Sequence, residues 1–231
     1  MTKYVMVLDT ETTNSVEQPI PYDIGGLILN TKTGEIVETF SFVVAEIFLD
    51  KEMMSSAYYA EKVPQYWEGI QNGERKLKRF LNIRKEIHQI MKTYNIKRVF
   101  AYNMGFDRRS TNNDTRYLTS SAIRWFFPYG TELLDIWHAT CVSLLNTKKF
   151  CNWATENGFV SEKGNIQTSA EVAYRYLTND PTFKEEHKGL EDCQIEAALL
   201  MNCVKRKVKM EYYQINTACW RKVQKNRVQV A

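Results

Sequence analysis

Residues 3–9 read KYVMVLD, an almost continuously apolar run that ends on an aspartate. A strand of this kind is buried on both faces, which is typical of a sheet covered by helices. Two more apolar runs follow, at 24–29 and at 36–44, and the second is rich in β-branched and aromatic residues. We therefore expect the chain to open with three consecutive strands of one sheet.

The rest of the chain alternates between helical and strand-like patterns. Apolar residues recur with a helical period over 75–93, and short apolar runs at 98–102 and 133–135 predict two further strands. Helices are also expected within 51–71, from residue 106, after 135 through 145, and at 150–157, 168–178 and 187–205. A strand-rich first half and a helical second half predict one α/β domain.

The composition is that of an ordinary globular protein. Of 231 residues, 44% are hydrophobic and 25% are charged, a balance that excludes intrinsic disorder. No stretch of about 18 apolar residues occurs, so neither a membrane span nor a membrane partner is expected. The first apolar run is too short for a secretory signal, and the five cysteines show no zinc-binding spacing. We expect reduced cysteines in a cytoplasmic protein.

Positive charge is concentrated at the C-terminal end. The whole chain has a net charge of +4, but residues 205–231 hold eight basic side chains against one acid. Such a segment suggests a polyanionic partner, and a solvated surface helix is the alternative. We divide the chain into a body, 1–204, and a basic C-terminal extension, 205–231, whose basic residues are Lys205, Arg206, Lys207, Lys209, Arg221, Lys222, Lys225 and Arg227.

Two carboxylates stand at the end of the first strand. Asp9 and Glu11 are two residues apart, so both side chains point to the same side of the strand. No basic residue in the nearby sequence compensates their repulsion. A divalent cation would do so, and oxygen ligands of this kind suit Mg²⁺ or Mn²⁺.

Two later segments place acids at similar junctions. Asp107 follows the strand-like run 98–102, at the start of the next helix, and Asn103 precedes it where it can cap or orient the turn. Asp192 lies on the first turns of an apolar helix. His187 is five residues earlier, and on one continuous helix the two would lie about 140° apart. We therefore expect His187 in the loop that enters this helix, close to Asp192.

Three segments, VLDTETT (7–13), YNMGFD (102–107) and HKGLED (187–192), resemble the exonuclease motifs of the DEDDh 3′–5′ exonucleases. The order and spacing match over roughly residues 3–204. Two positions depart from the family pattern, Asn14 where glycine is frequent and Tyr102 where histidine is frequent.

The resemblance implies an RNase H-like fold, a mixed β-sheet flanked by α-helices. It further implies that Asp9, Glu11, Asp107 and Asp192 hold two divalent cations, Mg²⁺ or Mn²⁺, and that His187 is the general base. The implied reaction releases nucleoside 5′-monophosphates from the 3′ ends of single-stranded DNA or RNA. Substrate contacts are expected from Thr12, Thr13 and Asn103, with the two threonines acting through their backbone groups.

Two other functions stay open at this point. One is a proofreading or accessory subunit that docks a polymerase or another replication partner. The aromatic residues of the basic segment are compatible with such docking. The other is a nucleic-acid-binding protein whose active site has lapsed, although all five catalytic residue types are present.

Some residues compete for roles in the site. Tyr176 and Asp180 fit the pattern of the sister DEDDy group, but Pro181 disfavours helical geometry at Asp180. Asp135 ends a strand-like run and more readily caps the next helix than binds a metal. The adjacent Tyr58 and Tyr59 could stack on nucleobases, with core packing the favoured interpretation.

Overall fold

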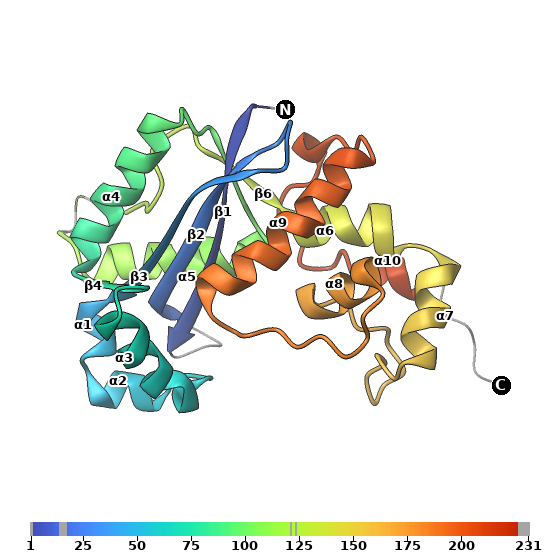
Figure 1. Ribbon diagram of the computed structural model, residues 1–231, viewed down its shortest axis with the longest axis horizontal. Helices are drawn as coiled ribbons and strands as arrows, with labels where there is room; N and C mark the ends of the chain where they lie inside the picture. Colours follow the sequence, from blue (N-terminus) through green and yellow to red (C-terminus); the bar gives the residue numbers. More distant parts are fainter. Residues whose placement is uncertain (1, 14–17, 121, 123, 226–231) are drawn as a thin grey trace.

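A computed structural model of the chain describes residues 2–13, 18–120, 122 and 124–225 (Figure 1). Asn14 and Arg227, both named above, lie outside the described residues. Over the described part of the chain, six strands form one mixed sheet in the order β4-β3-β2-β1-β5-β6. The strands are β1 (Tyr4–Thr13), β2 (Ile20–Asn30), β3 (Ile36–Val44), β4 (Lys76–Lys78), β5 (Arg98–Ala101) and β6 (Glu132–Asp135).

The first three strands are antiparallel neighbours, as expected from their short connections. β5 pairs parallel with β1, β6 pairs parallel with β5, and β4 pairs parallel with β3. β1 therefore lies inside the sheet, with neighbours on both sides. Its central residues Val5, Met6, Val7 and Leu8 are fully buried, which explains the continuous apolar run.

Helices cover both faces of the sheet. Val5 and Val7 pack on one face with α9 (Gly189–Lys205), whereas Met6 and Leu8 pack on the other. Figure 1 shows α9 crossing the sheet beside α6, α8 and α10. With α9 on the first face are α6 (Ile136–Thr140), a π-helical turn at Cys141–Leu145, α7 (Lys148–Glu156), α8 (Ala170–Thr178) and α10 (Arg221–Gln224). On the second are α1 (Ala45–Phe48), α2 (Lys51–Ser55), α3 (Val63–Gln71), α4 (Phe80–Thr93) and α5 (Met104–Tyr117).

The predicted α/β class and mixed sheet flanked by helices are confirmed. Two predictions are wrong. The first strand does not end at Asp9, because β1 stays paired with β2 up to Thr13 and both Asp9 and Glu11 lie within it. The helix expected over 75–93 begins at Phe80, and Lys76–Lys78 form the edge strand β4. The apolar Leu77 lies in phase with the helical stripe that follows, so sequence periodicity alone extends the helix too far. Pairing with β3 decides the conformation of this segment.

The basic C-terminal segment packs against the body. Met210, Cys219 and Val223 are buried in the same apolar cluster as α9. The Gln224 side chain accepts a hydrogen bond from the Ile166 N–H and donates one to the Ile166 carbonyl. The part of the expected extension that the structure describes, up to residue 225, is thus a packed part of the fold with its basic side chains outside.

All five cysteines are buried and free. Among the helices of the described ranges, none is both long enough and apolar enough to cross a membrane.

A candidate metal centre beside the first strand

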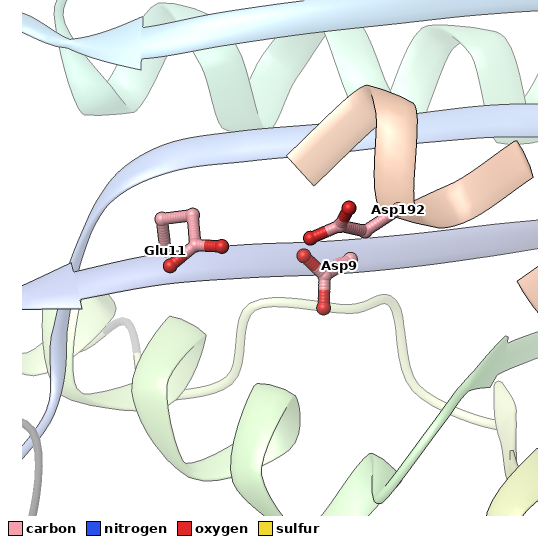
Figure 2. A group of neighbouring side chains, drawn as sticks. All are labelled: Asp9, Glu11 and Asp192. Carbon is pink, nitrogen blue, oxygen red and sulfur yellow. The ribbon is translucent and has the colours of Figure 1, made fainter. Parts of the chain in front are cut away.

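Asp9, Glu11 and Asp192 come together where the start of α9 lies over the C-terminal half of β1, a strand inside the sheet (Figure 2). One carboxylate oxygen from each residue lies within 4.8 Å of the other two. Asp9 and Glu11 stand on β1 and share the face of Val5 and Val7, as their spacing predicts. Asp192 is buried in the first turn of α9, above them. The candidate metal centre is this group of three carboxylates.

Two glycines allow α9 to approach β1 so closely. Gly25 on β2 is the pairing partner of Asp9, and Gly189 begins α9. A Cβ atom on Gly25 would lie 2.0 Å from the Gly189 carbonyl carbon and 2.0 Å from the Leu190 nitrogen. Any side chain at Gly25 would therefore displace the start of the helix that holds Asp192.

A buried ion-pair network holds the start of α9 in place. Asp23, the strand partner of Glu11, accepts hydrogen bonds from the Gly189 N–H at 3.0 Å and from the Tyr66 hydroxyl at 2.7 Å. The Arg75 guanidinium lies 3.4 Å from Asp23 and 2.5 Å from Glu191, the residue before Asp192. Two contacts thus tie α9 to the sheet within three residues of Asp192.

The pKa values of the three carboxyl groups in the centre are strongly raised. Burial raises the pKa of Glu11 to about 8 and that of Asp192 to about 9, and neighbouring acids add to both shifts. Burial also raises the pKa of Asp9 well above its usual range, with Asp107 the first of the charges that contribute. One oxygen of Asp192 has no hydrogen-bond partner among the described residues. Several carboxylates this close repel one another, and a divalent cation bound between them would offset the repulsion and accept the unpartnered oxygen as a ligand.

Asp107 lies next to this group but is held separately. It stands in the first turn of α5, and its Oδ1 accepts a hydrogen bond from the Thr10 hydroxyl at 2.9 Å. Thr10 lies between Asp9 and Glu11 on β1 and points to the opposite face. Burial raises the pKa of Asp107 to about 7. The structure thus brings the fourth sequence-predicted carboxylate close to Asp9, outside the group of three.

His187 lies in the loop that enters α9, where the sequence places it. Its backbone is left-handed, with φ of 52°, and its ring stacks on Tyr59 with the ring centroids 4.4 Å apart. The Nδ1 atom lies 3.8 Å from a Glu185 oxygen. Partial burial lowers the pKa of His187, and the nearby Lys62 lowers it further. The imidazole is therefore neutral at pH 7 and able to accept a proton.

The three residues expected to contact the substrate lie in two places, at the end of β1 and at the start of α5. Thr12 and Thr13 are buried at the end of β1, and the Thr13 hydroxyl donates to the Ile20 carbonyl at 3.3 Å. Asn103 adopts a left-handed backbone, with φ of 69°, where α5 begins. Its N–H donates to Asp135, whereas its side chain makes no capping hydrogen bond. Asn103 therefore orients the turn through its backbone and does not cap the helix.

Sequence reasoning missed two acids beside the centre. Glu196 is only 2% exposed and accepts a hydrogen bond from the Tyr102 N–H. Within the part of the chain that the structure describes, its other oxygen has no hydrogen-bond partner. It stands one turn after Asp192 on α9, so the four-residue spacing was the available signal. Burial raises the pKa of Glu185, in the loop before α9, to about 7, and its charge contributes to the raised pKa of Asp192.

The competing residues take other roles. Asp135 accepts a hydrogen bond from the His138 N–H and caps α6, as predicted. Tyr176 is partly buried and packs against Phe150, and the exposed Asp180 accepts a hydrogen bond from the Thr182 hydroxyl. Core packing, the favoured expectation for the tyrosine pair, is wrong for Tyr58, which is 72% exposed because the loop turns it toward solvent.

Comparisons with known proteins identify the fold. No protein-family model matches the chain, and no curated protein matches it in sequence. Among solved structures, the nuclease domain of 3′hExo, a DEDDh family member bound to rAMP, is similar with a TM-score of 0.58 and 18% identity, over 93% of this chain and 96% of that one. A 3′-exonuclease in a structure of 3′-end recognition of a histone mRNA stem-loop has a TM-score of 0.55 and 15% identity, over 93% and 86%.

Exonuclease I of E. coli, in complex with a dT13 oligonucleotide, is also similar, with a TM-score of 0.58 and 12% identity. The match covers 92% of this chain and 42% of the exonuclease I chain. At these identities the likeness concerns the fold, and the chain has the fold of the DEDDh 3′-exonucleases. The fold expected from the three sequence motifs is confirmed.

Proposed function

We propose that this protein is a metal-dependent 3′–5′ exonuclease that releases nucleoside 5′-monophosphates from single-stranded DNA or RNA. The observation that carries the proposal is the convergence of Asp9, Glu11 and Asp192 within 4.8 Å, in a fold shared with DEDDh 3′-exonucleases. The similar solved structures include complexes with a stem-loop RNA, a DNA oligonucleotide and rAMP. These ligands support nucleic acid as the substrate.

Asp9, Glu11 and Asp192, with Asp107 beside them, would hold two divalent cations, Mg²⁺ or Mn²⁺. The raised pKa values and the unpartnered Asp192 oxygen support this, because a bound cation would stabilise the charged carboxylates and would give that oxygen a partner. When bound, such cations supply positive charge that stabilises the attacking and leaving oxygens of an in-line displacement.

His187 would act as the general base, since its lowered pKa keeps the ring neutral near pH 7. It takes a proton from the attacking water, whose oxygen bonds to phosphorus while the bond from phosphorus to the 3′ oxygen breaks. The 3′ oxygen leaves with a proton from solvent. The backbone at Thr12 and Thr13, together with Asn103, would hold the terminal nucleotide at the strand end.

The decisive experiment is digestion of 5′-end-labelled 20-nucleotide DNA and RNA single strands, with Mg²⁺, with Mn²⁺ and with EDTA. We expect a ladder that shortens from the 3′ end, and loss of activity by orders of magnitude in Asp9→Ala and Asp192→Asn. Asp180→Ala is the matched control, because this carboxylate is exposed and outside the site. In His187→Ala, turnover should fall while calorimetric Mg²⁺ binding stays nearly intact.

Three results would contradict the proposal. The first is a wild-type protein that digests neither strand with either cation. The second is near-normal hydrolysis by Asp9→Ala, and the third is full activity in EDTA.

A further inference from the structure

A groove runs along the outward side of α5. It consists of two adjoining hollows of about 500 and 570 Å³, which share the lining residues Arg108, Asn112 and Ile215. One hollow reaches Asn103 at the start of α5, and the other reaches Tyr129 in the loop before β6. We call these two hollows together the α5 groove.

The groove begins beside the candidate metal centre. Val7 on β1 pairs with Phe100 on the parallel strand β5, so Asp9 and Tyr102 follow at the same level. Asn103 comes next, at the same edge of the sheet and one strand away from Asp9. Neighbouring strands lie about 4.8 Å apart. Asp9 points to the face that α9 covers and α5 lies on the other face, so a strand that ends at the metal centre would cross the C-terminal end of β5 to reach the groove at Asn103.

The lining combines positive charge with exposed aromatic rings. Arg108 and Arg109 stand on the exposed side of α5, and none of the described lining residues is acidic. Trp125 is 62% exposed and Tyr129 is fully exposed. Two large exposed rings that line the same hollow form the kind of surface patch that marks a binding site, unlike rings scattered singly over a surface. Arginines beside exposed rings match the phosphates and base faces of a single strand.

The backbone at Trp125 and Phe126 is anchored by hydrogen bonds. Arg84 of α4 donates to the backbone carbonyls of Trp125, at 2.9 Å, and Phe126, at 3.1 Å. The Phe126 N–H donates to the Asn112 side chain on α5, and the Phe126 ring is fully buried. The backbone at these two residues is therefore anchored to two helices, and the Trp125 side chain is exposed before any ligand arrives. Such preorganisation lowers the entropy cost of stacking.

We propose that the α5 groove binds the nucleotides that precede the 3′ end, with Arg108 and Arg109 on phosphates and Trp125 and Tyr129 stacked on bases. This inference rests on the proposed function and adds the path of the strand away from the metal centre. Neither stacking nor phosphate contact reads a base edge, so the groove accepts single strands with little regard to sequence.

The test is fluorescence anisotropy with 5′-labelled dT12 and dT3, in Ca²⁺ and over a range of salt concentrations. In Trp125→Ala/Tyr129→Ala, dT12 should bind about 5- to 100-fold more weakly for each base that is no longer stacked. In Arg108→Ala/Arg109→Ala, the slope of log K against log salt should flatten by up to about 1.4, since each single-strand phosphate contributes about 0.7. Both variants should lose the affinity that wild type gains from dT3 to dT12.

Arg116→Ala and Tyr212→Ala are the matched controls, because both side chains are exposed and neither lines the groove. Both controls should bind dT12 like wild type. Wild-type affinity and salt slope in the two groove variants would overturn the groove while leaving the exonuclease proposal intact. Conversely, weakened dT12 binding in those variants, with no digestion by wild type, would support the groove and contradict the proposed function.

Discussion

Replacing Arg75 by methionine tests whether the buried ion pairs hold α9 in position. Arg75 and Asp23 are almost fully inaccessible to water, and the guanidinium is the basic group that pairs with this carboxylate. Removing one partner of a buried pair typically costs about 3–5 kcal/mol. Asp23 keeps its hydrogen bonds from Tyr66 and Gly189, so we expect the low end, about 3 kcal/mol in the free energy of unfolding.

This cost should grow with pH. Burial raises the pKa of Asp23, and Arg75 opposes that shift. A carboxyl group whose folded-state pKa is raised stabilises the fold at low pH, and this stability is lost as the pH rises through the folded pKa. Without Arg75 the folded pKa of Asp23 rises further, so Arg75→Met should lose more stability at pH 8 than at pH 5.

Urea unfolding at both pH values measures these effects. Lys76→Met is the matched control, because the Lys76 side chain is 58% exposed and its ion pair with Glu86 at 3.7 Å should contribute at most about 1 kcal/mol. Adding Asp23→Asn to Arg75→Met should recover part of the loss, since the unpaired charge is then removed. A loss at pH 8 no larger than that of Lys76→Met would refute the reasoning.

Two further predictions follow from the metal centre and from the approach of α9. The pKa values of Glu11 and Asp192 are raised to about 8 and about 9, so the metal-free protein should lose stability as the pH rises from the ordinary carboxyl pKa, about 4, up to these values. Mg²⁺ binds the deprotonated carboxylates and should therefore raise the melting temperature more at pH 8 than at pH 6. An equal shift at both pH values would contradict the assigned ligands. Gly25→Ala should cost about 3 kcal/mol or more in urea unfolding, because its Cβ would meet the α9 backbone at 2.0 Å. Gly105→Ala, whose Cβ would meet only side-chain atoms, the Ile215 Cγ2 methyl at 3.1 Å and Asn103 Oδ1 at 3.9 Å, should cost clearly less. Equal losses in the two variants would argue against tight packing at Gly25.

Local sequence was sufficient for features that depend on neighbours along the chain. The apolar run of β1 indicates a strand buried on both faces, and the two-residue spacing of Asp9 and Glu11 puts both on one side of it. The helical stripe after Asp192 likewise predicts α9, and His187 falls in the loop before it. These conclusions need only the periodicities of 2 and 3.6 residues.

Contacts between distant segments required the tertiary structure. Arg75 falls within a segment that periodicity assigns to a helix, yet it bridges Asp23 and Glu191, which are 52 and 116 residues away. The burial of Glu196 beside Asp9 and the packing of Val223 into the core also result from contacts between segments that are far apart in the sequence. Periodicity records which face of an element is apolar, but the partner of that face depends on how the elements pack. Sequence alone therefore determined the strand, the helix and the acids that they carry, whereas the tertiary fold decided which charges meet.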